Sequence, residues 1–194
     1  MQTAINSVKL EKVIIVTYIR LMSNYKSEFV FIMLKPVAAK NQVLSDLITS
    51  KLEEFGDIRY IRKGILVDKE KIRQHYKYSQ RSFWYPFITN YLSGKLVSFF
   101  ILEQNHEKYL IPDADQRSFA QFLRNEIIGP SDICKIKKHH LRRLALQKPT
   151  FMLDNLIHCS DNTLEALEEI DIWYEDDRNA ISLWHGKSDM PPAP

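Results

Sequence analysis

The sequence predicts an α/β (α+β) sandwich of the split βαβ kind, formed by one sheet and the helices that pack on it. Segments with the composition of buried strands alternate along the chain with segments whose apolar residues recur at helical spacing. The five glycines lie far apart, and none belongs to a P-loop or to a dinucleotide fingerprint. The sequence has no internal repeat, which argues against a repeat architecture.

The first strand and helix have boundaries typical of their kind. Residues 28–36 form an apolar run that ends in Lys-Pro, which is typical of a buried strand. Residues 41–55 carry apolar side chains on one helical face, and Gly56 is expected to end this helix. Apolar and polar residues then alternate over residues 57–67, which predicts a second strand.

A pair of helices is predicted between the second strand and the third. Asp68 is a suitable N-cap for a helix through residues 69–76, and a second short helix is expected over 83–92. Gly94 lies in a turn that leads into an apolar run over 95–102. We predict the third strand there.

The rest of the domain is predicted to hold two helices, a basic stretch and the last strand. Residues 118–128 have a helical pattern that ends at Gly129, and residues 133–146 are basic and expected to be partly helical. A short fourth strand is predicted over 151–157, and a helix over 162–172. The complete order predicts a ferredoxin-like βαββαβ sandwich in which helices cover a four-stranded antiparallel sheet.

The 194 residues are enough for one domain with a sizeable core and for extensions at both ends. Met22 is an alternative start, because the predicted domain begins only a few residues later. The apolar run over 13–19 is too short to cross a bilayer, so we expect no membrane association. The predicted division is an N-terminal extension over 1–27, a domain over 28–174 with an insertion at about 104–118, and a C-terminal extension over 175–194 whose end is expected to be disordered.

Charge and cysteine content limit the class of partner. The formal net charge of +3 suits an anionic ligand without arguing for DNA or RNA. Cys134 and Cys159 give neither a disulfide framework nor a zinc-binding pattern. We therefore expect reduced thiols and a cytoplasmic protein.

His158 is placed between an apolar segment and a predicted helix N-terminus, where unpaired N–H groups attract anions. Imidazole is a nucleophile toward phosphoryl groups, although a histidine here could also be a polar residue in a turn. Glu169 is about three helical turns farther along and could orient the ring or face solvent. Lys35 ends a buried strand, where α/β proteins place ligand contacts, but its amine could equally extend to water.

Arginines and aromatic residues elsewhere also suit a phosphorylated ligand. Arg124, Arg142 and Arg143 could bind phosphate oxygens bidentately, although helical arginines usually face solvent. Tyr76 and the aromatic run 83–85 could stack on a base, or they could pack in the core. Taken singly, none of these residues is specific for a function.

Several short motifs are specific when they are taken together and in order. The strongest is Asn155-Leu-Ile-His-Cys-Ser-Asp161, followed by Glu168-Glu-Ile-Asp-Ile-Trp-Tyr174. The others are Phe31-Ile-Met-Leu-Lys-Pro36, His75-Tyr76, Tyr91-Leu-Ser-Gly94, Ile128-Gly-Pro-Ser-Asp132 and Leu141-Arg142. In this order the motifs resemble those of the nucleoside diphosphate kinases, and the resemblance covers about residues 28–174.

The resemblance implies an enzyme that transfers the γ-phosphate of a nucleoside triphosphate to a nucleoside diphosphate by a ping-pong route. His158 would become phosphorylated, and Ser160 and Glu169 would hold it. Mg²⁺ would bridge the nucleotide phosphates and need few protein ligands, and the protein would be a homo-oligomer, either a hexamer or a tetramer. Trp84 would stack on the base and tolerate any base. The nucleotide-binding residues implied in this way are Lys35, Tyr76, Trp84, Arg124, Ser131, Arg142 and Asn155.

The chain also departs from the family pattern. Cys159 replaces the usual glycine beside His158, and its thiol could crowd a phosphohistidine or act as a redox-sensitive group. Insertions leave Arg124 aligned only after a gap. They also leave open whether Arg142 or Arg143 matches the family arginine.

Two other functions remain open at this point. A catalytically weak member of the same fold would bind nucleotide as a regulatory or interaction module. A small nucleic-acid-binding domain would use the aromatic residues and the basic run 135–143, but that run also suits a solvated helix, and nucleic acid is the less expected partner. Turnover of a nucleoside diphosphate and salt-dependent binding to single strands would distinguish these functions.

Overall fold

A computed structural model describes residues 28–109, 117–146 and 153–175. They form a four-stranded antiparallel sheet in the order β2-β3-β1-β4. The strands are β1 (Phe29–Leu34), β2 (Gly56–Leu66), β3 (Leu96–Gln104) and β4 (Ile157–Cys159). Strands that are neighbours in the sheet but not in the chain are joined through helices, so the predicted ferredoxin-like α+β sandwich is confirmed.

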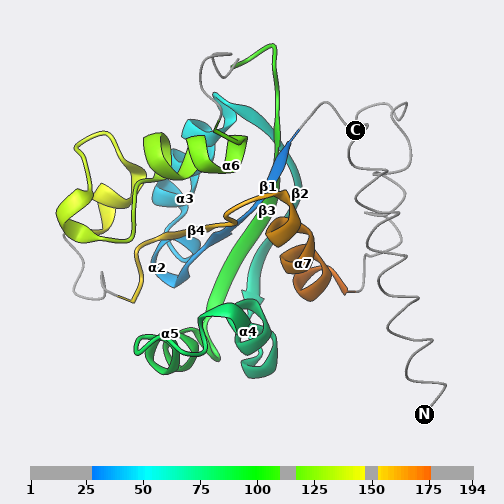
Figure 1. The fold of residues 1–194 in the computed structure, drawn as a ribbon, viewed down its shortest axis with the longest axis vertical. Helices are drawn as coiled ribbons and strands as arrows, with labels where there is room; N and C mark the ends of the chain where they lie inside the picture. The colour runs from blue at the N-terminus through cyan, green and yellow to red at the C-terminus, as the bar shows by residue number, and fades with distance from the viewer. Residues whose placement is uncertain (1–27, 110–116, 147–152, 176–194) are drawn as a thin grey trace.

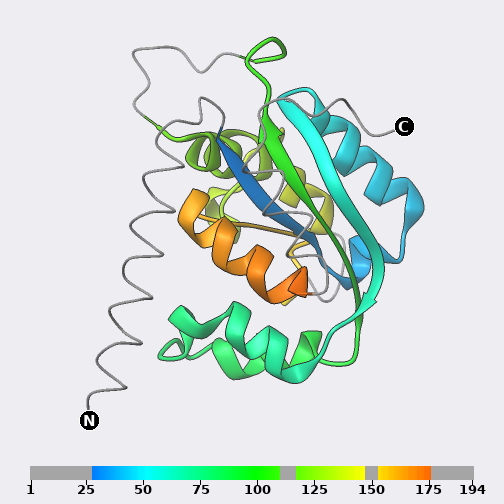
Figure 2. The same ribbon diagram turned by 90° about the vertical axis from the view of Figure 1, so that its right-hand side faces the viewer.

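Helices cover both faces of the sheet (Figures 1 and 2). Helices α3 and α6 lie on one face, and α4, α5 and α7 pack against the other. The α-helices are α2 (Pro36–Ala39), α3 (Gln42–Glu53), α4 (Lys69–His75), α5 (Tyr85–Leu92), α6 (Phe119–Phe122) and α7 (Thr163–Trp173). Shorter helical segments are the 3₁₀ turns Lys77–Ser79, Ile133–Lys135 and Leu141–Ala145 and the π-helix Leu123–Ile128, which continues α6.

Four helices begin at polar residues whose side chains accept backbone N–H bonds, and one of them is α6, which Ser118 caps. Asn41 caps α3, Asp68 caps α4 as predicted, and Asn162 caps α7. Such caps each stabilise a helix start by about 1 kcal/mol. They fix where the chain leaves the sheet and therefore where α4 and α7 lie on its surface.

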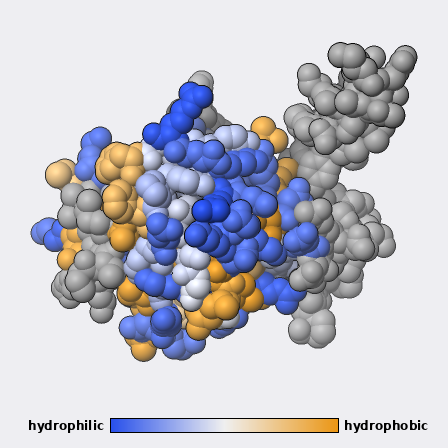
Figure 3. All heavy atoms as spheres, turned by 90° about the horizontal axis from the view of Figure 1, so that it is seen from below, coloured by the Kyte–Doolittle hydropathy of each residue, from blue (hydrophilic) through white to orange (hydrophobic). Residues whose placement is uncertain are grey.

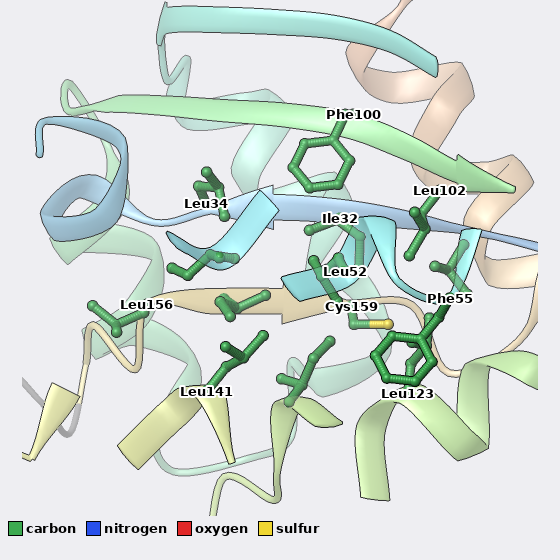
Figure 4. Close-up of a cluster of buried hydrophobic side chains, with 14 of the residues drawn as sticks. Ile32, Leu34, Leu52, Phe55, Phe100, Leu102, Leu123, Leu141, Leu156 and Cys159 are labelled. Carbon is green, nitrogen blue, oxygen red and sulfur yellow. The ribbon is translucent and has the colours of Figure 1, made fainter. Parts of the chain in front are cut away.

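Strand β1 is buried on both sides, and its alternating side chains belong to two separate cores. Phe29, Phe31 and Met33 pack under α4, α5 and α7. The alternate residues Val30, Ile32 and Leu34 pack under α3 and α6, in the cluster that Figure 4 shows. The sheet therefore has one core on each face.

Strand β4 lies farther along the chain than residues 151–157, where it was predicted, and it contains His158. The side chain of Asp154 accepts the N–H of Leu156, and Asn155 O accepts the N–H of Ile157, so this segment forms a turn. Leu156 has a φ of 72°, which also interrupts a strand. Residues 151–152 lie outside the described residues.

Gly56 has a different role from the helix stop that was predicted. Helix α3 ends at Glu53, and Gly56 begins β2. A Cβ on Gly56 would lie 2.3 Å from the carbonyl oxygen of Glu103, so the glycine permits close approach of β2 to β3.

The predicted extensions at the two chain ends fall almost entirely outside the described residues, as do residues 110–116 of the predicted insertion. Within the residues described, no helix combines the length and the apolar character needed to cross a bilayer.

Candidate active site

His158 lies in β4, on the sheet face that α4, α5 and α7 cover. Its neighbours Ile157 and Cys159 point into the opposite core, because successive side chains of a strand alternate between faces. His158 is opposite Met33 of β1, and its ring centroid lies 6.4 Å from that of Phe31. The sheet therefore presents His158 between β1 and the α4–α7 layer.

Glu169 of α7 fixes one nitrogen of this ring. His158 Nε2 and Glu169 Oε1 are 2.6 Å apart, which leaves Nδ1 as the nitrogen not engaged by the carboxyl group. Burial lowers the pKa of His158 well below its usual value, and Lys35, Arg142 and Arg124 lower it further. The ring is therefore a neutral imidazole at neutral pH, the form that can act as a nucleophile.

The Glu169 carboxyl group is almost fully buried behind the ring. Burial raises its pKa well above the usual value, and the neighbouring Ser160 hydroxyl opposes that rise. Ser160 itself donates to Phe31 O and accepts from Phe31 N at 2.8 Å. Ser160 was expected to hold the histidine; its hydroxyl bonds the Glu169 carboxyl group that engages His158, and its bonds to Phe31 also hold β1 beside the end of β4.

A second histidine, His75 at the end of α4, stands in the same site. Its ring centroid is 4.4 Å from that of His158, and its Nδ1 is 3.4 Å from Glu169 Oε1. Trp173 donates its indole N–H to the same Nδ1 at 3.3 Å. His75 belongs to the motif His75-Tyr76 but had no predicted role, because the sequence alone does not show that the end of α4 meets α7.

His75, His158 and Glu169 have ligand atoms within 4.8 Å of one another, which invites the question of a metal site. The 2.6 Å contact between His158 and Glu169 is a hydrogen-bond distance, and the Trp173 N–H already occupies the Nδ1 lone pair of His75. Hydrogen bonds therefore engage His158 Nε2, Glu169 Oε1 and His75 Nδ1 of this cluster.

Lys35 follows β1 directly, and only 6% of it is exposed. Its backbone N–H donates to Leu156 O at 2.8 Å, which joins the end of β1 to the segment before His158. Burial lowers the pKa of Lys35 to about 7; Arg142 also lowers it, and Asp154 opposes the shift. An anion that entered the site would restore the charged form of this amine.

Arg142 is the arginine that the 141–145 turn directs inward, whereas Arg143 is exposed. Its guanidinium donates to Gly129 O at 2.7 Å, to Ser131 Oγ at 3.1 Å and to Ile157 O at 2.9 Å. Its Nε is buried and has no hydrogen-bond partner among the described groups. Burial lowers the pKa of Arg142 to about 10, so it stays charged at neutral pH.

Arg124 occupies the π-helix and forms an ion pair with Asp161, the residue that precedes the cap of α7. The π-turn is closed by the N–H of Gly129, which donates to Arg124 O at 2.9 Å. Arg124 is close enough to His158 to lower its pKa. The structure thus brings Arg124 to the rim of the site with its guanidinium engaged by a carboxylate.

Tyr76, Trp84 and Asn155 complete the predicted set. The ring of Tyr76 lies 6.0 Å from that of His158 and 6.0 Å from that of Trp84, which is partly exposed. Aromatic side chains therefore lead from the histidine toward solvent. Asn155 is buried, and its Oδ1 has no hydrogen-bond partner within the described parts of the chain.

Cys159 takes no part in the site. Its side chain lies in the α3–α6 core, where Figure 4 shows its sulfur near Phe55 and Leu123. Burial raises the pKa of this thiol to about 12, so it is protonated and unreactive at neutral pH. The expected crowding of the histidine by Cys159 is therefore absent, and a redox role has no support in this geometry.

The assembled groups suit a polyanion that carries a reactive electrophile and hydroxyl groups. A neutral imidazole has one nitrogen free of the carboxyl group, two buried cations lie beside it, and the buried Arg142 Nε and Asn155 Oδ1 are among the polar atoms that lack a hydrogen-bond partner in the part of the chain described. Seen from the α4–α5 end, hydrophilic residues dominate the surface (Figure 3). Asp161 and Glu169 are already engaged by Arg124 and His158. A divalent cation at this site would therefore be held mainly by the ligand's phosphates.

Comparisons of this chain with known proteins identify the family and the solved structures to which it is similar. A family model described as nucleoside diphosphate kinase matches residues 28–179. A search of curated protein sequences gave no match. Similar solved structures are the nucleoside diphosphate kinases of Aquifex aeolicus (20% identity, 75% of this chain and 94% of that chain covered, TM-score 0.53) and Encephalitozoon cuniculi (21%, 77%, 90%, 0.57), and a nucleoside diphosphate kinase family protein of Babesia bovis (15%, 77%, 90%, 0.56).

Proposed function

The chain belongs to the nucleoside diphosphate kinase family, and from this premise we propose that it transfers the γ-phosphate of a nucleoside triphosphate to a nucleoside diphosphate through a phosphohistidine at His158. The observation that carries the proposal is the bond between His158 Nε2 and Glu169, which leaves Nδ1 of a neutral ring to attack. Imidazole competes well as a phosphoryl acceptor at neutral pH.

In the first half-reaction, His158 Nδ1 attacks the γ-phosphorus, and the bond from that phosphorus to the β–γ bridging oxygen breaks. The nucleoside diphosphate leaves with the bridging oxygen and both electrons of that bond. The ring then bears the phosphoryl group on Nδ1 and a proton on Nε2, and Glu169 stabilises the positive charge through the bond that it already makes. The second half-reaction is the reverse, with another nucleoside diphosphate as acceptor.

Binding and charge stabilisation are assigned to the groups around the histidine. Phosphoryl transfer is mostly a matter of positioning and of neutralising charge, so buried cations are the expected catalytic surroundings. Mg²⁺ would enter as part of the nucleotide complex, and we infer that no dedicated carboxylate site holds it. Lys35, Arg124, Ser131 and Arg142 would bind the phosphates, Tyr76 and Asn155 the sugar–phosphate region, and Trp84 the base.

A nucleotide-binding module without turnover is the second candidate. The ion pair between Arg124 and Asp161 favours it, because a paired guanidinium is not available to a phosphate. The neighbouring Glu165, whose pKa burial raises to about 7, would add negative charge to the same rim above that pH.

Labelling with γ-labelled ATP and Mg²⁺ tests the proposal. The wild type should acquire a label that is stable in alkali, is lost by hydrolysis in acid and is removed by added GDP. His158→Ala should acquire none, whereas His139→Ala, which changes an exposed histidine, should label like the wild type. A wild type that binds ATP but never labels would establish the second candidate.

A further inference from the structure

Asp154 is a buried carboxylate that the catalytic proposal does not use. None of it is exposed, and it lies directly before Asn155. Its Oδ2 accepts the N–H of Val37 at 2.8 Å and the O–H of Tyr91 at 3.0 Å, and its Oδ1 accepts the N–H of Leu156 at 3.2 Å. Burying a carboxylate is costly unless hydrogen bonds compensate for the lost water, so these three donors indicate that Asp154 has a specific structural role.

The three donors come from three separate parts of the chain. Val37 belongs to α2 and lies two residues after Lys35. Tyr91 belongs to α5, the helix that starts directly after Trp84. Leu156 lies two residues before His158 and has the positive φ noted above. One carboxylate therefore joins the segment after Lys35, the α4–α5 region and the turn into β4.

Asp154 also acts on the charge of Lys35. The pKa of this lysine falls to about 7 mainly through burial and secondly through Arg142, and the carboxylate of Asp154 raises it. His75 and His158 add no positive charge at neutral pH, since burial holds the pKa of each well below its usual value. The titratable groups that interact electrostatically with Lys35 are Arg142 of the 141–145 turn, Asp154, His75 at the end of α4 and His158 of β4.

We propose that Asp154 is a positioning residue that fixes Lys35, α5 and the β4 turn relative to one another. The inference depends on the proposed function, because only that function gives Lys35 a phosphate to bind. Asp154 touches none of the reacting atoms and acts through Lys35 and through the backbone around His158.

Asp154→Asn tests the electrostatic part. The change keeps the size of the side chain and removes its charge, so the pKa of Lys35 should fall below that of the wild type. Because kcat/KM reports groups that titrate in the free enzyme, the ratio of wild-type to variant kcat/KM for the nucleotide should grow as pH rises from 6 to 8. A fall of one unit from the wild-type pKa of about 7 corresponds to an increase of about fivefold in this ratio between pH 6 and pH 8. Taking the ratio at each pH removes the titration of the nucleotide itself.

Tyr91→Phe is the matched control. It removes one hydrogen bond to the same carboxylate without changing any charge, so its ratio to wild type should be the same at every pH. A ratio for Asp154→Asn that is also independent of pH, or no loss at all, would overturn the proposed effect on Lys35.

Two measurements separate this inference from the catalytic proposal. If the wild type shows no turnover, the dissociation constant of ATP with Mg²⁺ over the same pH range replaces kcat/KM and decides the role of Asp154. If Asp154→Asn does not fold, hydrogen exchange is compared between wild type and Tyr91→Phe. The amides of α5, Val37 and Leu156 should exchange at least about threefold faster in the variant. Equal exchange would refute the proposal that Asp154 joins these segments.

Discussion

The hydrogen bond between Glu169 and His158 determines which nitrogen of the ring is free to react. Glu169→Gln keeps the shape of the side chain but can no longer balance the charge that forms on the ring. We expect the rate of phosphoenzyme formation to fall about 10- to 100-fold, the usual effect of removing a group that orients a reactive histidine. Rapid-quench labelling with ATP measures this rate.

Glu168→Gln is the control for that experiment. Glu168 precedes Glu169 in α7, is partly exposed and pairs with Lys77 at 3.0 Å, so its loss removes a surface ion pair of small energetic value. Its labelling rate should stay within about threefold of the wild type. Equal losses in both variants would mean that Glu169 contributes only as one of the negative charges of α7.

Cys159 is next to the nucleophile in sequence and separated from it in space. A thiol reagent should modify the exposed Cys134 rapidly in the native protein and Cys159 only on unfolding, because burial raises the pKa of Cys159 to about 12. Cys159→Gly should destabilise the protein by about 2 kcal/mol through a cavity and added chain entropy, and it should leave phosphoenzyme formation intact. Thermal unfolding and labelling measure the two effects, and loss of labelling in a folded variant would contradict the placement.

At the scale of elements, the turn after the π-helix positions Arg142. Gly129 has a φ of 91°, and a Cβ there would lie 2.6 Å from the ring of His140. Gly129→Ala should therefore cost about 3 kcal/mol or more of unfolding free energy, from both the backbone conformation and the steric overlap. Gly64→Ala is the matched change, since Gly64 has a φ of 65° but open space around its Cα.

Chemical denaturation compares these two glycine variants. Gly64→Ala should lose only the backbone contribution of about 1 kcal/mol. If both variants lose the same unfolding free energy, the contact between residue 129 and His140 does not contribute to stability and the turn is not tightly packed.

The elements that sequence patterns predict well are those whose boundaries depend on local chemistry. Asp68 caps α4 and the apolar run over 28–36 forms β1, because caps and buried strands are encoded by adjacent residues. The last strand is displaced because the side chain of Asp154 bonds the backbone locally and competes with strand pairing. The change from α- to π-helix at Leu123 has no periodicity signal that the sequence analysis could use.

The same distinction explains the candidate site. His158, Lys35 and the other predicted residues were found because their motifs occur in order along the chain. No role was predicted for His75 or Asp154, because each acts through contacts between segments that are distant in the sequence. His75 joins α4 to α7, and Asp154 joins α2, α5 and the β4 turn. Such contacts arise only once the sheet has formed, so single-sequence spacing does not show them.

At the scale of the whole molecule, helix α3 and the edge strand β2 expose apolar side chains that a partner copy could bury. Val43 and Leu47 of α3 are 79% and 52% exposed, and Ile61 and Leu66 of the edge strand β2 are 51% and 65% exposed. We expect copies of the chain to associate through these side chains into the predicted tetramer or hexamer. Light scattering after size exclusion should give four or six times the chain mass of 22.9 kDa, and a mass of one chain would contradict the expectation.

The two cores on opposite faces of the sheet have a consequence for divergence within the family. Every side chain assigned here to the histidine's hydrogen-bond network lies on the α4–α7 face, while the buried apolar side chains of the α3–α6 layer contribute packing. Substitutions in that layer alter melting temperature without touching the nucleophile, and Cys159 is an example of such a change one residue away from it. A lineage can thus drift far in sequence, adjusting stability on one side of a single sheet, while natural selection preserves the chemistry on the other.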